Sequence, residues 1–175
     1  LMLNSALEIN NFNTIYLKSL IDILKKMGAK LKVSKNSIKV SKGSKLKSTS
    51  LSTSPYPGFP TDLQAQLMSL MCISDGKSKI KETIFENRFM HVPELNRLGA
   101  NITVEKDTAT IIGNQTFKGA QVMASDLRAS ISLVLAAMNA NGQTTLNRVY
   151  HLDRGYENIE KTLGSLGVKI KRQKN

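Results

Sequence analysis

Apolar residues recur three or four positions apart in three segments, residues 17–28, 92–99 and 159–167, and each segment ends in a hydrophobic residue followed by glycine. Such spacing predicts a helix with one buried face, and the glycine supplies the positive φ that often ends a helix. Alternating strands are expected next, at 31–33, at 102–104 and around Ile170. The chain therefore contains a repeated helix–strand unit with a period of about 70 residues.

The first two of these strands are expected to turn back as hairpins. Short polar turns separate them from alternating segments at 38–40 and 109–111, a pattern typical of antiparallel pairs. The third copy stops after 170–172 without a returning strand, and the first copy shows no counterpart of the buried helix described next. The chain also opens at Leu1 and not at an initiator Met. We therefore expect that part of the fold is supplied by sequence upstream or elsewhere.

A second kind of helix lies between these units. Thr61 and Ser125 are predicted N-caps, and nearly unbroken apolar stretches follow both. A helix that is apolar on most sides belongs in the interior of a protein. Each helix is expected to lead into a strand, at 80–85 and 144–150. The pattern predicts one α/β (α+β) domain, residues 1–175, with three repeats, helices inside and sheets outside.

Composition narrows the class of protein. The single cysteine, Cys72, excludes an internal disulfide framework and fits a reducing compartment, and its apolar neighbours indicate a packed thiol. No apolar run is long enough to span a membrane and no leader peptide is evident, so we expect a cytoplasmic protein without a membrane partner. His91 and His151 are too isolated to indicate a metal site.

The formal charge of +12 raises the possibility of a nucleic-acid partner. However, the lysines are spread along the chain and alternate with apolar residues, as on solvated strand faces. The expected strands also lack stacking aromatics. We therefore expect no nucleic-acid partner, and a small anionic substrate, which needs only a few well-placed arginines, remains as an explanation.

Four charged residues could carry chemistry. Asp62 starts a buried helix beside a Pro-Gly loop, where it either favours the helix dipole or accepts a hydrogen bond or proton from a substrate hydroxyl. Arg88, Arg128 and Arg154 occupy ends of repeated elements and could converge on a phosphate or carboxylate ligand. Surface ion pairing with neighbouring acidic residues is the alternative for these arginines.

Four stretches resemble the UDP-N-acetylglucosamine 1-carboxyvinyltransferase family. They are residues 56–66 (YPGFPTDLQAQ), 83–95 (TIFENRFMHVPEL), 123–130 (MASDLRAS) and 150–156 (YHLDRGY). The resemblance implies an inside-out α/β barrel domain, one of two in the enzyme, with the active site between them. It implies transfer of enolpyruvyl from phosphoenolpyruvate to UDP-N-acetylglucosamine with release of phosphate, without metal or organic cofactor, as the first committed step of peptidoglycan and cell-wall synthesis.

The resemblance also assigns roles to residues. Asp62 contacts the sugar hydroxyl and is the candidate proton acceptor, while Ile84, through its backbone, and Phe85 contact the nucleotide sugar. Arg154 helps to hold phosphoenolpyruvate or phosphate. Arg88 and the stretch Asp126-Leu127-Arg128 line the cleft and steady its closed form.

Several family features have no match in this sequence. They are a Lys-Asn pair near the N-terminus, a mobile loop with a reactive Cys or Asp, and an Arg of the other domain; Cys72 is not that cysteine. The family's N-terminal segment crosses back to complete this domain, which would account for both defects of the repeat. We therefore expect a partner, the missing N-terminal catalytic domain, and no activity of the chain alone. A sugar-nucleotide-binding or regulatory module without catalysis is the main alternative, and a basic nucleic-acid-binding domain is another.

Overall fold

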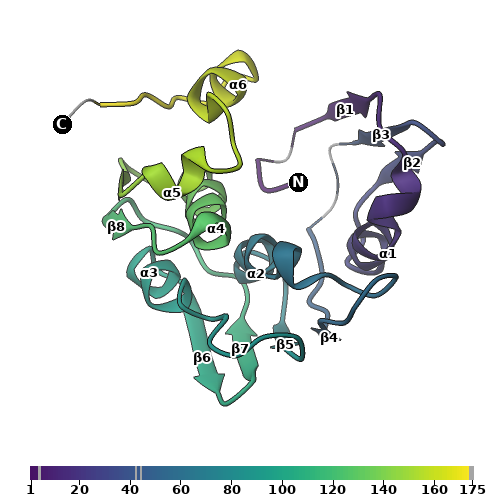
Figure 1. Cartoon of the computed structure of the whole chain (residues 1–175), viewed down its shortest axis with the longest axis horizontal. Helices are drawn as coiled ribbons and strands as arrows, with labels where there is room; N and C mark the ends of the chain where they lie inside the picture. Colours follow the sequence, from purple (N-terminus) through teal and green to yellow (C-terminus); the bar gives the residue numbers. More distant parts are fainter. Residues whose placement is uncertain (4, 42, 44, 174–175) are drawn as a thin grey trace.

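The computed structural model describes residues 1–3, 5–41, 43 and 45–173, which form three helix–sheet units (Figure 1). The first unit holds an antiparallel sheet of order β1-β3-β2 and a helix that follows a 3-10 turn. Its elements are β1 (Leu7–Asn10), η1 (Thr14–Leu17), α1 (Lys18–Lys26), β2 (Leu31–Val33) and β3 (Ser37–Val40). The predicted hairpin of β2 and β3 is confirmed, whereas β1 was not predicted.

The second unit is the most complete. Its four-stranded sheet has the order β4-β5-β7-β6, in which β7 returns from β6 and lies between β6 and β5. Its elements are β4 (Leu51–Ser52), η2 (Thr61–Leu63), α2 (Gln64–Cys72), β5 (Lys77–Lys81), α3 (Val92–Arg97), β6 (Asn101–Glu105) and β7 (Thr108–Ile112). The β6–β7 hairpin agrees with the sequence prediction.

The third unit has two parallel strands and three helices. Its elements are β8 (Gln121–Met123), α4 (Leu127–Met138), β9 (Thr145–Asn147), α5 (Tyr150–Asp153) and α6 (Ile159–Ser165). The strand expected around Ile170 is absent, since the described residues 168–173 form no strand. A lone extended segment has no neighbouring strand to take up its backbone hydrogen bonds.

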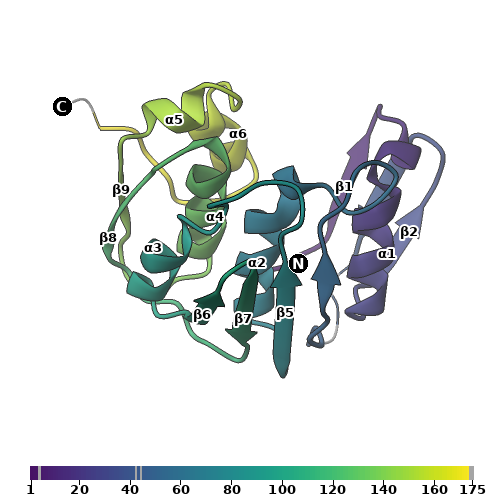
Figure 2. The ribbon, with the colours of Figure 1, turned by 60° about the horizontal axis from the view of Figure 1, so that its bottom comes forward.

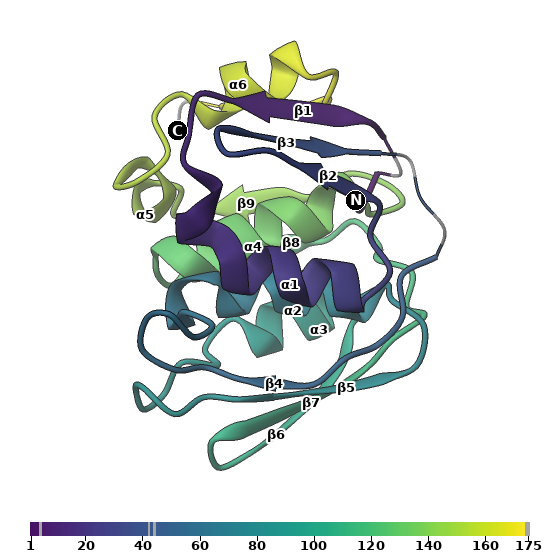
Figure 3. The same ribbon diagram turned by 90° about the vertical axis from the view of Figure 1, so that its right-hand side faces the viewer.

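The two apolar helices α2 and α4 pack against each other in the middle of the molecule (Figures 1 and 2). Met68 of α2 and Leu133 of α4 are fully buried, and the Ser69 hydroxyl donates to the Ser132 carbonyl across the contact at 2.9 Å. Helices α1 to α4 lie between the sheet of the first unit and that of the second (Figure 3). The prediction of helices inside and sheets outside is thus confirmed.

Glycines end the three amphipathic helices as predicted. Gly28, Gly99 and Gly167 have φ values of 91°, 98° and 89°. Glycine adopts this left-handed conformation without the steric cost that a Cβ imposes.

Both predicted N-caps are wrong. The segment before α2 starts as the 3-10 turn η2 after Pro60, and the Thr61 hydroxyl donates to Glu82 instead of capping. In α4 the cap is Asp126, one residue after Ser125, and the Ser125 hydroxyl donates to the Asp126 carboxylate.

The two strands that follow the buried helices differ from their predicted bounds. β5 ends at Lys81 because the next carboxylate, Glu82, accepts the backbone N–H groups of Ile84 and Phe85 and bends the chain away from the sheet. β9 ends at Asn147 because Arg148 has a φ of 57°, which a strand does not accommodate.

Candidate functional site

Asp62 and Arg128 form an ion pair between the starts of the two buried helices. Nε of Arg128 donates to Oδ1 of Asp62 at 2.5 Å, and Nη2 forms an ion pair with the same oxygen at 2.5 Å. The Asp62 side chain is 65% exposed and that of Arg128 is 34% exposed, so the carboxylate keeps access to solvent. The structure thus brings together two of the predicted site residues from segments 66 positions apart. Arg128 pairs with Asp62 and not with its neighbour Asp126.

Asp126 has a different task from Asp62. Its Oδ1 accepts the backbone N–H groups of Arg128 at 2.9 Å and of Ala129 at 3.1 Å, which caps α4. Partial burial alone would raise the pKa of Asp126, but the hydrogen bonds from these amides and from the Ser125 hydroxyl outweigh it and lower the pKa. The carboxylate is therefore ionised at neutral pH and fixes the first turn of α4, which carries Leu127 and Arg128.

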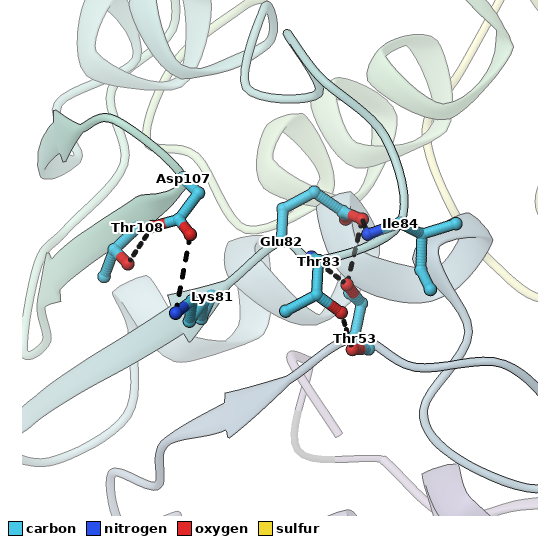
Figure 4. A network of polar contacts seen from close by, with 7 residues as sticks. All are labelled: Thr53, Lys81, Glu82, Thr83, Ile84, Asp107 and Thr108. Atoms are coloured by element: carbon cyan, nitrogen blue, oxygen red, sulfur yellow. Dashed lines mark hydrogen bonds and ion pairs between the residues drawn. The ribbon is translucent and has the colours of Figure 1, made fainter.

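Glu82 is the centre of a polar network that sequence reasoning missed (Figure 4). The residue is only 4% exposed. Its Oε1 accepts from the Thr53 hydroxyl at 2.9 Å and from the backbone N–H groups of Ile84 at 2.9 Å and Phe85 at 3.3 Å. Its Oε2 accepts from the Thr61 hydroxyl at 2.8 Å. One buried carboxylate thus joins the residue before Asp62 to the backbone that the family resemblance places at the nucleotide sugar.

The sequence did contain a signal for Glu82. Ser78 and Ile80 are the buried positions of β5. Glu82 continues this alternation two residues later, so the pattern places it on the buried side as well. A carboxylate on the inward side of a strand must find hydrogen-bond donors, because a buried unpaired charge is strongly unfavourable.

Phe85 and Arg88 lie in the loop after β5. The guanidinium carbon of Arg88 is 4.3 Å from the centre of the Phe85 ring, a cation–π contact, and Phe85 is 54% exposed. Both side chains, with Ile84, line a groove of about 890 Å³ between this loop and the β6–β7 turn. Within the described residues no ion pair joins Arg88 to Glu86, so the surface-pair alternative does not hold for it.

Arg154 follows α5 and is exposed. Its neighbour Asp153 binds Arg172 through two hydrogen bonds of 2.6 and 2.9 Å, and these bonds from Arg172 lower the pKa of Asp153. The alternative of an ion pair between Arg154 and Asp153 therefore does not hold, and among the described residues Arg154 has no ion pair. A Cβ added at Gly155 would lie 2.9 Å from the Leu127 side chain, so this turn packs directly on the start of α4.

The predicted residues thus fall into two linked groups. Asp62, Arg128, Leu127 and the turn after α5 meet at the start of α4, while Ile84, Phe85 and Arg88 lie on the loop after β5. Glu82 connects the two groups through hydrogen bonds to Thr61 and to the loop backbone. Guanidinium groups and a partly exposed carboxylate in such an arrangement can bind anionic groups and orient a hydroxyl.

Cys72 is fully buried in α2, and burial raises the pKa of its thiol to about 12, which agrees with a packed thiol. In the part of the chain that the structure describes, no group of three or more His, Cys, Asp or Glu side chains could hold a metal ion. No helix among the described residues has the length and apolar character needed to cross a membrane.

Curated relatives that are about half identical to this chain in sequence are named UDP-N-acetylglucosamine 1-carboxyvinyltransferase. The protein from Pelagibacter ubique is 54% identical over 166 residues, and that from Azorhizobium caulinodans is 55% identical over 157 residues. The alignments cover 95% and 89% of this chain but 40% and 37% of the relatives. The chain therefore spans less than half the length of the curated relatives that it matches.

Solved structures show the same architecture. The enolpyruvyl transferase NikO from Streptomyces tendae has a TM-score of 0.88 at 29% identity, over 95% of this chain and 40% of that one. An EPSP synthase from Acinetobacter baumannii has a TM-score of 0.71 at 16% identity, over 98% of this chain and 40% of that one, and supports the fold alone. These similarities confirm the fold and the resemblance predicted from the sequence. Because the sequence profile of the EPSP synthase (3-phosphoshikimate 1-carboxyvinyltransferase) family matches residues 1–163, this chain belongs to that family.

Proposed function

We propose that this chain forms one side of the active site of an enzyme that transfers enolpyruvyl from phosphoenolpyruvate to UDP-N-acetylglucosamine and releases phosphate. The observation that carries the proposal is the partly exposed Asp62 carboxylate, held by Arg128 at the meeting point of the two buried helices. Both residues belong to segments that resemble this transferase, and relatives at 54% identity carry its name. The reaction serves the first committed step of peptidoglycan and cell-wall synthesis in the cytoplasm.

Asp62 is the group proposed to act on the sugar. Its free carboxylate lone pairs accept a hydrogen bond from the attacking hydroxyl and then its proton, while Arg128 holds the side chain in place. The Ile84 backbone and the exposed Phe85 ring contact the nucleotide sugar. Because the Ile84 N–H is already bound to Glu82, its carbonyl oxygen is the backbone group left for that contact.

The arginines are proposed to bind the anionic reactant. Arg154 is exposed, precedes the Gly155 turn that packs on Leu127, and has no ion pair among the described residues, so its guanidinium can take a phosphate or carboxylate in bidentate geometry. Arg88, which contacts Phe85, and the Asp126-capped start of α4 are proposed to line the same cleft, as the resemblance implies. No cofactor is assigned to the reaction, and charge stabilisation by preorganised donors is the main catalytic contribution.

We also infer that residues 1–175 are one domain that needs the rest of the enzyme for completion. Leu7 and Ile9 of β1 are 39% and 45% exposed. The positions of β5 in the same pairing register, Ser78 and Ile80, are 1% and 0% exposed. Among the described residues, no internal helix therefore covers β1 in the way that α2 covers β5.

The third unit has a matching gap. A groove of about 760 Å³ lies between β9, α4 and residues 168–173. In the second unit the equivalent place is filled by β7, between β5 and β6. A strand from the remainder of the enzyme is proposed to occupy it, as the resemblance implies.

Titration of the chain with UDP-N-acetylglucosamine tests the proposal. Weak binding is expected for the wild type, because one wall of the cleft is present, and weaker binding for Asp62→Ala. Asp22→Ala is a matched control, since Asp22 also pairs on the surface, with Lys18, but in the first unit. Equal affinity of Asp62→Ala and the wild type would refute the role of Asp62. The chain alone is expected to release no phosphate from the two substrates, and turnover would refute the need for the missing domain.

A further inference from the structure

We infer that Glu82 is a positioning residue for sugar-nucleotide binding, which holds Asp62 and the Ile84–Phe85 backbone in one fixed arrangement. The inference rests on the proposed function, because its consequence is measured at the proposed sugar-nucleotide site. Neither the family resemblance nor the relatives assign a role to Glu82.

The hydrogen bonds to Oε1 of Glu82 have only one possible polarity. The Thr53 hydroxyl accepts the Thr83 backbone N–H at 2.9 Å, so its own proton points to Oε1 of Glu82. The Ile84 and Phe85 amides can only donate. Three donors therefore converge on Oε1, and only an acceptor can take that place.

The network fixes the loop after β5 to β4. Besides its bond to Glu82, Thr53 accepts through its carbonyl from the Thr83 hydroxyl (Figure 4). The loop that carries Ile84 and Phe85 therefore has attachments both to Glu82 and to the end of β4. Hydrogen bonds to a charged acceptor are about twice as strong as neutral ones, so the carboxylate gives this loop a single preferred position.

The second oxygen of Glu82 reaches the other half of the site. The Thr61 hydroxyl donates to Oε2, and the next residue is Asp62, whose carboxylate holds Arg128. This bond draws Thr61 away from the N-cap role and keeps the turn η2 in place. Glu82 thus sets the distance between the Asp62 carboxylate and the backbone of the loop after β5, although Glu82 itself is buried too deeply to touch a ligand.

The basic residue adjacent in sequence, Lys81, does not neutralise Glu82. Lys81 precedes it but points to Asp107, with Nζ 3.5 Å from Oδ2 (Figure 4). The carboxylate is therefore satisfied by hydroxyl and amide donors alone. Such a site keeps its geometry only while every donor stays in place, which is the property required of a positioning residue.

Four variants of the full chain separate positioning from simple stability. Glu82→Ala removes the acceptor, and Glu82→Gln keeps one oxygen for the amides while the Thr61 hydroxyl can turn to accept from the new amide. Thr61→Val breaks only the link towards Asp62. Ser78→Ala is the matched control, because Ser78 is buried in β5, just before Glu82, and accepts the Thr49 N–H at 3.2 Å.

UDP-N-acetylglucosamine affinity, measured by calorimetry, is the first readout. Glu82→Ala is expected to weaken binding by at least about tenfold, whereas Glu82→Gln restores affinity to within about threefold of the wild type. Thr61→Val should fall between them, and Ser78→Ala should bind as the wild type does. Unchanged affinity of Glu82→Ala, or an equal loss in Ser78→Ala at matched stability, would overturn the inference.

Amide and guanidinium nuclear magnetic resonance signals of the ligand-free chain are the second readout. Glu82→Ala should shift the Ile84 and Phe85 amides and also the Nε–H signal of Arg128, which reports the Asp62 contact. Thr61→Val should shift the Arg128 signal and leave Ile84 in place, so the prediction is testable even if Glu82→Ala does not fold. An unmoved Arg128 signal in Thr61→Val, with Glu82→Ala unfolded or likewise unmoved, would refute the coupling. Absence of UDP-N-acetylglucosamine binding by the wild type would instead refute the proposed function. The signal shifts would then still test whether Glu82 positions Asp62 and the Ile84–Phe85 backbone.

Discussion

His91 should make the stability of this chain depend on pH. The ring is 3% exposed at the start of α3, and its Nε2 is buried without a hydrogen-bond partner among the described residues. Burial lowers its pKa from 6.5 to about 4, although the nearby Asp126 carboxylate acts in the opposite direction. The folded protein therefore holds His91 neutral at a pH where the unfolded chain protonates it.

The sign and size of the effect follow from proton linkage. Between pH 6.5 and about 4 the unfolded chain binds a proton at His91 that the folded chain does not, so lowering the pH favours unfolding. The loss of stability starts as the pH falls through 6.5 and is complete near 4. With these two pKa values, the free energy of unfolding is about 2 kcal/mol lower at pH 5 than at pH 7.5.

Urea unfolding of the wild type, His91→Gln and His151→Gln at about pH 7.5 and about pH 5 measures this contribution. Glutamine is neutral at both values, so His91→Gln should lose about 2 kcal/mol less on acidification than the wild type. The comparison isolates His91, because other groups, including the partly buried Leu1 amino group, contribute equally to both proteins. His151→Gln controls for loss of a histidine and should behave as the wild type does. An equal loss in wild type and His91→Gln would refute the account of a buried neutral ring.

Four further predictions concern packing and exposure. Gly113→Ala should lower the free energy of unfolding by about 2–3 kcal/mol in urea, because a Cβ there would lie 1.9 Å from the Ser74 carbonyl oxygen. Gly164→Ala should raise it by about 0.5–1 kcal/mol, because a Cβ in that helix meets nothing within 4 Å, and a loss would contradict this. Cys72 should not react with a thiol reagent at about pH 8 until urea unfolds the chain, since burial raises its pKa to about 12, and rapid labelling of the folded chain would disprove it. Asp62→Ala should change the free energy of unfolding by less than about 1 kcal/mol, because this side chain is 65% exposed, and a larger loss would show that the pair supports the fold.

Helices with clear periodicity could be predicted from the sequence, and so could the hairpins. The series that end at Gly28, Gly99 and Gly167 need only local spacing and a terminal glycine, and both are visible in the chain. The strands β1, β4 and β8 were not predicted from the sequence. Of these, β4 and β8 have only two and three residues. Elements of that length are set by the neighbouring strand and carry little pattern of their own.

Strand ends were missed for a related reason. β5 and β9 stop where a particular contact or backbone conformation intervenes, at Glu82 and at Arg148. Neither cause lies in the hydrophobic pattern, which continues past both points. The residue types of the candidate site were visible in the sequence, but the pairing of Asp62 with Arg128 depends on the packing of α2 against α4, which local patterns do not contain.

The two buried helices start alike in sequence but use their aspartates differently. Both helices start with a hydroxyl residue, an aspartate and a leucine, so the same dipole role was the natural expectation for Asp62 and Asp126. In α4 the aspartate does act at the helix start, because the Asp126 carboxylate accepts two backbone N–H groups and caps the helix. In the second unit Glu82 binds the Thr61 hydroxyl, the chain enters α2 through a 3-10 turn, and the Asp62 carboxylate is released from capping. The buried Glu82 therefore makes the second unit differ from the third. In the second unit it leaves the aspartate carboxylate available to Arg128 and to a ligand.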